Sequence, residues 1–268
     1  MGVPLTLILP DRDSHWYDAT GKPCYEVKMT TKEGMRPVTI ADARKLSLVP
    51  SVTTIMGVVA KPGLEVWKQT QAIFSALTLP RFKDETEDAF AKRVVQDMKE
   101  ESRAAAGAGT DIHDIIEHWL HNNISKSLTK EETTFLELFT SWYKEQGLQM
   151  QATEKSFALT SEGFGGRVDY VGFFKDRRCI LDWKTQATKA DLQVRFYPEY
   201  GAQLAAYAVG IFGLQDATKA SLLSVVVSRN EVGRIEMHEY EFEPYWKAFV
   251  AAKDLWYSPL GPGNTLKG

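Results

Sequence analysis

The sequence has little cysteine and no long apolar run. Only Cys24 and Cys179 occur among its 268 residues, which excludes a disulfide framework. No stretch approaches the roughly 20 apolar residues that a membrane-spanning helix needs. The first residues also lack a basic segment followed by an apolar one, the pattern of a signal peptide. These absences predict an intracellular, cytoplasmic protein without a membrane partner.

An excess of one charge sign is missing as well. The formal net charge is −3, from 32 Lys and Arg against 35 Asp and Glu. No broad basic field therefore surrounds the chain, and a polyanionic ligand would need a local concentration of cations. The hydrophobic share of 44% and the charged share of 25% are those of an ordinary globular protein. The length suits one large domain or two small ones.

Two β-rich runs around a charged tip predict a hairpin in the second half of the chain. Residues Arg167–Phe174 alternate in character, Lys175–Arg178 form the tip, and Cys179–Leu181 begin the returning strand. Residues paired across the strands share a face of the sheet, and so do residues two apart. The register of the hairpin therefore decides which side chains meet.

If Phe174 pairs with Cys179, Asp169 lies opposite Lys184, and Asp182 shares their face. Neighbouring carboxylates repel unless a cation lies between them, and hard oxygen ligands favour Mg²⁺ or Mn²⁺. A lysine beside such a pair can position a water or stabilise developing negative charge, which suits hydrolysis of a phosphodiester. The alternative is an ordinary hairpin in which Lys184 makes a surface salt bridge.

The segment Tyr197–Ala208 predicts a helix directly after this hairpin. Pro198 suits the first turn of a helix. The side chains of Tyr200, Gln203 and Tyr207 lie at helical spacing and share one face. For Gln203 and Tyr207 the alternative is plain helix packing.

These three segments together resemble the PD-(D/E)XK nuclease superfamily, and more narrowly its RecB-type branch, which includes phage exonucleases and the mitochondrial genome maintenance exonuclease. The resemblance rests on three motifs within roughly residues 105–210. They are G-x-x-D at Gly166–Asp169, D-x-K-T at Asp182–Thr185 and Q-x-x-x-Y at Gln203–Tyr207. The stretch P-S-V-T-T-I, at residues 50–55, resembles phage-type members more weakly, and the chain could be phage-encoded in a bacterial host.

The resemblance implies a set of site residues. Expected catalytic residues are Asp169, Asp182, Lys184, Gln203 and Tyr207; expected metal ligands are Asp169, Asp182, His113 and Glu154; expected DNA contacts are Arg167, Thr185 and Tyr200. Some relatives of this branch hold an iron–sulfur cluster, which takes four cysteines. With two cysteines, this chain is expected to hold none.

His113 lies in Gly109–Glu117, similar to the G-T-x-x-H-x-x-x-E setting of the same branch. Thr110 or Asp111 could cap this helix, and His113 could be a metal ligand or contact the scissile phosphate. Alternatively, His113 pairs with the carboxylate four residues later. The neighbouring histidines at 118 and 121 suggest a zinc peptidase as an alternative. The order H-x-x-x-E-H, however, matches neither of the usual zinc-peptidase motifs, H-E-x-x-H and H-x-x-E-H.

Glu154 is the candidate for the further carboxylate that this family carries upstream of the hairpin. It lies in a weakly alternating run at 151–159, and the alternative is a solvated strand glutamate. Six basic residues gather around the candidate site, which is consistent either with phosphate contacts or with solvated surfaces. They are Arg167, Arg177, Arg178, Lys184, Lys189 and Arg195.

The expected architecture is α/β, a restriction-endonuclease-like mixed sheet of four or five strands flanked by helices, with a helical N-terminal region. We expect residues 1–147 to form a β-rich segment and a helical region packed on or over the site, 148–257 the nuclease core and 258–268 a flexible tail. Four helices are expected at 65–77, 84–106, 110–122 and 130–146. The helical region could form a wall whose aromatics stack unpaired bases; the candidates are Trp67, Phe74, Trp119 and Trp142.

The function predicted from these features is a Mg²⁺- or Mn²⁺-dependent deoxyribonuclease, expected to act as an exonuclease on single-stranded DNA or DNA ends. Its partners would be DNA and recombination or replication proteins. Two alternatives stay open. One is a structure-specific or sequence-specific endonuclease on the same scaffold, and the other is a non-catalytic DNA-binding or recombination protein.

Overall fold

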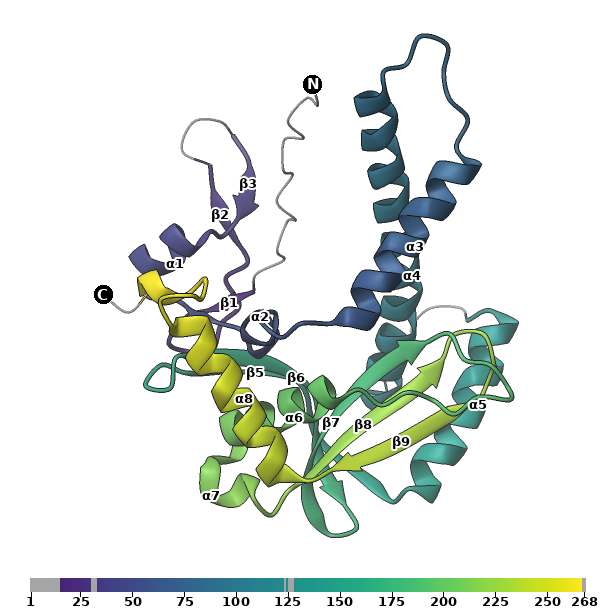
Figure 1. Ribbon diagram of the computed structural model, residues 1–268. Helices are drawn as coiled ribbons and strands as arrows, with labels where there is room; N and C mark the ends of the chain where they lie inside the picture. Colours follow the sequence, from purple (N-terminus) through teal and green to yellow (C-terminus); the bar gives the residue numbers. More distant parts are fainter. Residues whose placement is uncertain (1–14, 30–32, 123, 125–127, 267–268) are drawn as a thin grey trace.

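A five-stranded mixed sheet forms the centre of the protein (Figure 1). This computed structural model describes residues 15–29, 33–122, 124 and 128–266, with the backbone alone for 101–111. The strands lie in the order in which they follow in the chain. They are β5 (Leu148–Leu159), β6 (Phe164–Phe174), β7 (Arg177–Gln186), β8 (Ser221–Ser228) and β9 (Ile235–Tyr240).

All neighbouring strands of this sheet are antiparallel except β7 and β8. A parallel pair needs a crossover connection, and here α6 (Pro198–Phe212) and α7 (Leu214–Ala217) provide it. The carboxyl ends of β7 and β8 therefore lie together at one end of the sheet, which we call the site end. The predicted mixed sheet and its flanking helices are confirmed.

Each face of the sheet buries its own apolar core. One core places α6 and α8 (Phe242–Tyr257) against the sheet, and the other places α4 (Glu87–Leu120) and α5 (Lys130–Glu145) there. Small residues among the buried ones of helix α6 allow it to approach its neighbours closely. They are Gly201, Ala202, Ala205, Ala206 and Ala208.

The hairpin of β6 and β7 differs from the predicted register. Lys175 and Asp176 alone form the turn, with φ of 48° and 62°, and Phe174 pairs with Arg177 rather than with Cys179. Two-residue turns in which both φ angles are positive match the twist of the flanking strands. The predicted four-residue tip, Lys175–Arg178, is therefore wrong. The error is two residues, an even number, so each side chain keeps its predicted face.

A single long helix replaces two of the predicted ones. α4 is continuous from Glu87 to Leu120, so the break expected between residues 106 and 110 is wrong, and neither Thr110 nor Asp111 caps a helix start. Glycine costs only about 1 kcal/mol in a helix interior, and the alanine-rich sequence around Gly107 and Gly109 supports continuation. The other predicted helices, α3 (Pro62–Thr78) and α5, are confirmed.

Helices α3 and α4 form an arm that extends away from the sheet (Figure 1). The carboxyl-terminal part of α4 returns to the sheet and contacts β7. None of the described helices is long and apolar enough to cross a membrane.

The N-terminal segment packs on the α6 side of the sheet. It contains two short strand pairs and two short helices, and the buried Trp16 contacts Trp256 of α8 edge to face. The described part of the expected tail folds back as a 3-10 helix, with Leu266 packed against the same core. The elements are β1 (Trp16–Tyr17), β2 (Glu26–Lys28), β3 (Met35–Pro37), α1 (Ile40–Lys45), β4 (Val49–Pro50), α2 (Val52–Met56) and η1 (Asn264–Leu266).

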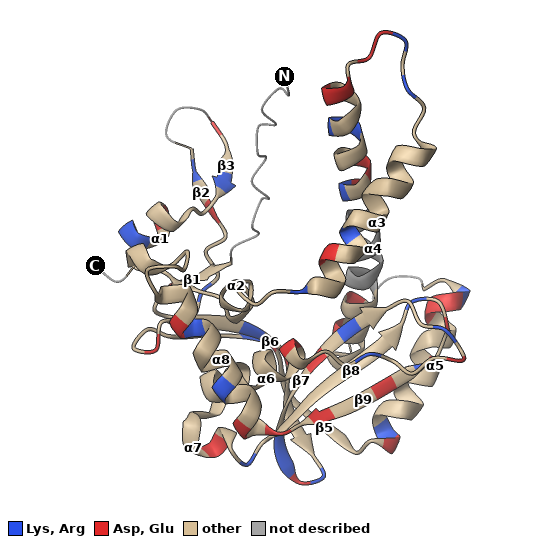
Figure 2. Ribbon diagram, in the orientation of Figure 1, with Lys and Arg blue, Asp and Glu red and all other residues tan. Residues whose placement is uncertain are grey.

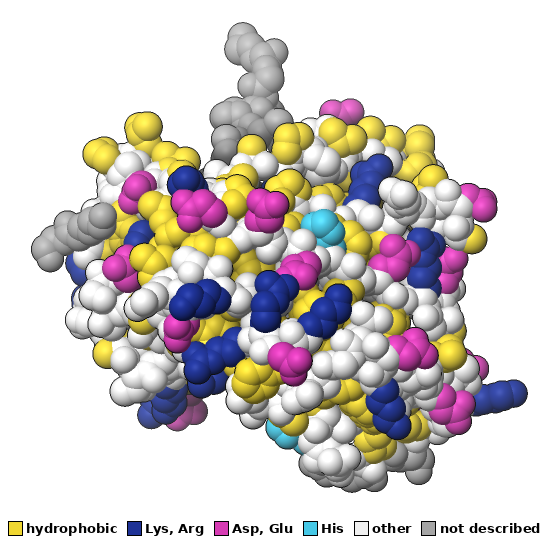
Figure 3. Space-filling model, turned by 90° about the horizontal axis from the view of Figure 1, so that it is seen from below, with side chains coloured by type: hydrophobic (Ala, Val, Ile, Leu, Met, Phe, Trp, Pro, Cys, Tyr) yellow, Lys and Arg dark blue, Asp and Glu magenta, His cyan; other side chains and the backbone are white. Residues whose placement is uncertain are grey.

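Charged residues of both signs are interspersed over the molecule (Figure 2). At the end of the sheet that carries the β6–β7 turn, seen from below in Figure 3, basic side chains lie among acidic ones. Arg177 pairs there with Glu239, and Arg178 pairs with Asp216. These two arginines, predicted near the site, lie at the opposite end of β7.

Candidate active site

The two hairpin aspartates meet on the α6 face of the sheet. The last printed pair of the ladder is Tyr170 with Leu181, and one step further the register sets Asp169 against Asp182. An oxygen of Asp169 accepts a hydrogen bond from the backbone N–H of Trp183 at 3.0 Å. The convergence predicted from the sequence is therefore present, although Asp169 faces Asp182 rather than Lys184.

Lys184, Gln203 and Tyr207 form a hydrogen-bonded network with Asp182. The Lys184 ammonium lies 2.5 Å from Oδ2 of Asp182 and donates to Oε1 of Gln203 at 3.3 Å. Nε2 of Gln203 donates to Oδ1 of Asp182 at 3.1 Å and contacts the Tyr207 hydroxyl at 2.9 Å. One helix thus fixes the orientation of the carboxylate and the ammonium together.

The glycine of the G-x-x-D motif makes room for this network. A Cβ at Gly166 would lie 2.7 Å from Cε1 of Tyr207 and 3.0 Å from the ring of Phe157. Such a distance is shorter than any relaxed contact between carbon atoms. The close approach of α6 to β6 therefore requires glycine at this position.

Burial and like charge govern the titration of the carboxylates. Burial, reinforced by the charge of Asp182, raises the pKa of Asp169 well above its ordinary value. Burial alone would lower the pKa of Lys184, but Asp182 and Asp169 outweigh it and raise that pKa. The two carboxylates therefore favour the protonated, cationic form of Lys184.

Glu154 lies beside the aspartates in a strained backbone conformation. The pairs on either side, Thr153 with Tyr170 and Lys155 with Val168, set it opposite Asp169. Its φ is 50°, a left-handed value that costs a non-glycine residue of order 1 kcal/mol or more. Burial also raises the pKa of its carboxyl.

The side chain of Glu154 is held by Arg167, whose Nε lies 2.6 Å away. Arg167, a predicted DNA contact, is thus engaged with a neighbouring carboxylate. Of the other two predicted contacts, Tyr200 places its ring 5.0 Å from the Lys184 ammonium. Thr185 shares the face of Trp183 by strand alternation and points away from the aspartates.

Helix α4 brings His113 to the same region. Burial lowers the pKa of its imidazole, the charges of Asp182 and Lys184 act on it, and it hydrogen-bonds the backbone of Trp183. His121, further along α4, contacts the Thr153 hydroxyl at 2.6 Å. These contacts dock α4 beside both β7 and β5.

Asp114 and Glu117 of α4 complete the acidic surroundings. Both charges raise the pKa of Glu154. Asp114 was not singled out from the sequence. The helical spacing from His113 to Glu117 was visible, but only the docking of α4 against β5 brings these residues next to Glu154.

The four candidate aromatics separate into two groups. Trp119 and Trp142 are half-buried and pack against the core between α4, α5 and the sheet. On α3, Trp67 is 42% exposed and Phe74 is 56% exposed. Of these four side chains, the α3 pair is the more exposed.

The donor set fits a hard divalent cation. In the described part of the chain, no group of three or more His, Cys, Asp or Glu is arranged to hold an ion by itself. Asp182 Oδ2 is buried and has the Lys184 ammonium 2.5 Å away, although no well-directed hydrogen bond from a described residue reaches it, and Asp169 is buried beside it. Mg²⁺ binds through one or two carboxylates when water and phosphate oxygens fill its other positions, so two aspartates suffice.

Comparison with known proteins identifies the family. The family model described as "PD-(D/E)XK nuclease superfamily" matches residues 74–245, well over half of the chain. The chain belongs to the PD-(D/E)XK nuclease superfamily. Its mixed sheet with flanking helices is the restriction-endonuclease-like fold that the sequence predicted, and nucleases of this superfamily generally use Mg²⁺ or Mn²⁺.

Two further comparisons add little to this superfamily assignment. A solved structure titled "Crystal structure of SSO0001" is similar at 13% identity and a TM-score of 0.30, covering 76% of this chain and 87% of that one. At this TM-score the likeness says nothing about the site. No curated protein matches the chain.

Proposed function

We propose that the protein is a Mg²⁺- or Mn²⁺-dependent deoxyribonuclease of the RecB-type branch, acting as an exonuclease on single-stranded DNA or DNA ends. The observation that carries the proposal is the network joining Asp182, Lys184, Gln203 and Tyr207 opposite Asp169. A surface salt bridge would not need a half-buried glutamine bonded to the carboxylate, the ammonium and a tyrosine at once.

In the proposed site Asp169 and Asp182 hold the cation, and Glu154 and His113 beside them are the candidates for further ligands once the cation draws them in. The bound cation supplies Lewis-acid polarisation of the phosphate and a more acidic water. Protonated Lys184 donates to the phosphate oxygen on which negative charge develops. Gln203 fixes Lys184 and Asp182 in their mutual orientation, and Tyr207 fixes Gln203.

The exposed aromatics of α3 and the position of the arm that carries them support a single-stranded substrate. Trp67 and Phe74 are exposed on α3, two helical turns apart and on one face. Exposed aromatic rings stack on unpaired bases of any sequence. The arm that carries them rises from the sheet beside α2 and the site end (Figure 1).

A cleavage assay with Asp182→Ala tests the proposal. The variant should lose metal-dependent cleavage, by about 100-fold or more because a charge-stabilising group is removed from the reacting centre. Its far-UV circular dichroism should match that of the parent. Lys219→Gln, an exposed change at the far end of β8, should leave cleavage intact. Full activity in Asp182→Ala would overturn the assignment of this site.

A further inference from the structure

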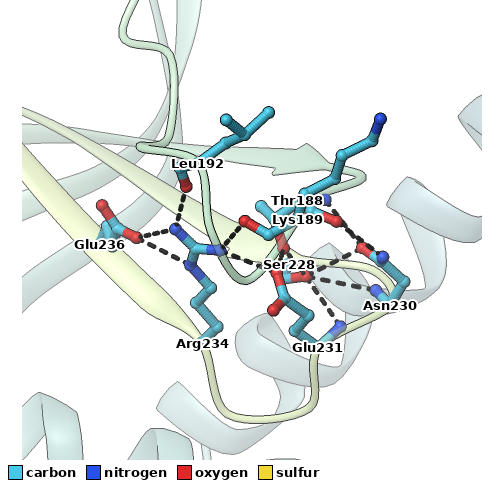
Figure 4. A network of polar contacts seen from close by, with 8 residues as sticks. All are labelled: Thr188, Lys189, Leu192, Ser228, Asn230, Glu231, Arg234 and Glu236. Atoms are coloured by element: carbon cyan, nitrogen blue, oxygen red, sulfur yellow. Dashed lines mark hydrogen bonds and ion pairs between the residues drawn. The ribbon is translucent and has the colours of Figure 1, made fainter.

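The segment between β7 and α6, residues 187–197, has no helix or strand, yet a polar network holds it (Figure 4). Arg234 at the start of β9 is the centre of this network. Its guanidinium donates to the backbone oxygens of Lys189 at 2.8 Å and Leu192 at 2.7 Å. The same group pairs with Glu231 at 2.8 Å and with Glu236 at 2.8 Å.

A second anchor lies at the start of the segment. The Asn230 side chain accepts from the backbone N–H of Thr188 and donates to its carbonyl oxygen, each at 2.8 Å. The Thr188 hydroxyl contacts that of Ser228 at 2.6 Å and also bonds Glu231. Thr188 is buried, so this end of the segment is fixed on both its backbone and its side chain.

The far end of the segment is tied to the sheet as well. Gln186 donates to the backbone oxygen of Arg195 at 2.9 Å, and the ring of Phe196 stacks on His238 of β9 at 5.2 Å. Backbone groups in surface loops normally bond water and move. Here both ends and the middle bond the protein, so the segment has a defined shape.

This fixed segment lies next to the candidate site. Gln186 is two residues beyond Lys184 on the same strand, so both side chains share a face about 7 Å apart. Arg195 is held against Gln186. Immediately after the segment, α6 presents Tyr200 to Lys184 and Gln203 to Asp182.

Two cations of the segment are left for a ligand. Lys189 and Arg195 are exposed, and no carboxylate in the described part of the chain pairs with either. Figure 4 shows the Lys189 side chain pointing away from the network. The basic residues Arg167, Arg177 and Arg178, by contrast, are each paired with an acidic residue.

We propose that residues 187–197 are a pre-shaped guide for the sugar-phosphate backbone of a nucleic acid, in which Lys189 and Arg195 contact phosphates next to the scissile one. Arg234 is a positioning residue that acts through this segment. The inference deepens the proposed function and rests on it. It assigns binding to residues beyond the catalytic motifs and explains how a chain with net charge −3 can hold a polyanion.

The test is the salt dependence of binding by the full chain. The affinity for a short fluorescent oligothymidine is measured by anisotropy in EDTA, where no cleavage occurs. Each phosphate contact contributes about 0.7 to the slope of log K against log salt for a single strand. Lys189→Gln and Arg195→Gln should each lower the slope by about that amount and weaken binding several-fold at low salt. Lys219→Gln should leave the slope unchanged.

Two further variants sharpen the test. Asp191 is an exposed acid on the same segment, so Asp191→Asn should strengthen binding. Arg234→Lys keeps the charge but cannot bond two carbonyls and two carboxylates, so it should lower the slope like the loss of a contact. In the Lys189→Gln/Arg195→Gln background it should have no further effect, since the positioned cations are gone. A merely structural role would instead give additive losses.

The possible failures are distinguishable. If the parent protein cleaves and binds DNA but Lys189→Gln and Arg195→Gln keep its slope, the guide is overturned while the proposed nuclease stands. If the parent neither binds nor cleaves DNA, both proposals are overturned. An additive loss from Arg234→Lys in the doubly substituted background overturns its positioning role.

Discussion

At the scale of single residues, the site holds charge that the fold does not fully compensate. Asp169 is buried next to Asp182, and its raised pKa means that ionising it opposes folding. Natural active sites often carry such a cost, because the same uncompensated charge is what binds a cation. Whether ionised Asp169 destabilises the fold can be measured from thermal unfolding.

Asp169→Asn should be inactive yet more heat-stable than the parent at pH 8 without metal. Because the folded pKa of Asp169 is raised, its destabilising contribution is absent at low pH, appears as pH rises through the unfolded value and is complete above the folded value. The gain should therefore shrink as pH falls toward 4. Thermal unfolding across this pH range checks it, with each 1 kcal/mol worth about 2–4 °C. A lower midpoint for Asp169→Asn at pH 8 would contradict it.

Cleavage should also fall on the acid side at a higher pH than ordinary carboxyl groups would give. Burial raises the pKa of Asp169 and of Glu154, and a cation competes with protons for both. Raising the Mn²⁺ concentration should move the acid limb of the pH–rate profile to lower pH. If the pH of the acid limb does not change with the Mn²⁺ concentration, the group that controls it is not a metal-binding carboxylate.

At the scale of elements, the sequence predicts which side chains of β6 and β7 share a face of the sheet, but it does not predict which residues pair across the two strands. Alternation fixed the shared face of Asp169, Asp182 and Lys184, because an error of two residues leaves faces unchanged. The turn length was misjudged because Lys175 and Asp176 adopt positive φ without glycine. The left-handed Glu154 and the docking of α4 against β5 depend on tertiary contacts that no local pattern encodes.

Gly166→Ala tests the fit between α6 and the sheet. The added methyl should displace Tyr207, and with it Gln203, lowering kcat by about 10- to 100-fold, since small displacements at a site are costly. Stability should fall by about 1–3 kcal/mol from overpacking. Gly63→Ala on α3 is the matched control, because nothing lies within 4 Å of its Cβ. Unchanged kcat in Gly166→Ala would show that the network does not depend on this contact.

At the scale of the whole molecule, the arm of α3 and α4 is the least expected feature. The sequence showed helical periodicity there, yet it could not show that α4 runs unbroken for 34 residues from the tip of the arm to the site. Nor could it separate exposed Trp67 and Phe74 from Trp119 and Trp142, which are half-buried against the core. Spacing alone does not reveal which apolar face of a helix finds a partner.

Trp67→Ala and Phe74→Ala should weaken binding of single-stranded DNA by about 1–3 kcal/mol for each stacked base, with unchanged thermal stability. Leu77→Ala is the control, since Leu77 is 76% exposed on the same helix but has no aromatic ring. Titration by fluorescence anisotropy in EDTA gives the affinities. Equal effects of all three substitutions would indicate a general apolar contact rather than stacking.

The most direct measurement uses end-labelled linear and circular single-stranded DNA, each with Mg²⁺, Mn²⁺ or EDTA, for the parent protein and Asp182→Ala. The account predicts that the parent degrades the linear DNA only with metal, that the circle stays intact and that Asp182→Ala cuts neither. Cleavage of the circle would contradict an exonuclease. Cleavage in EDTA, or by Asp182→Ala, would contradict a metal-dependent nuclease site at these residues.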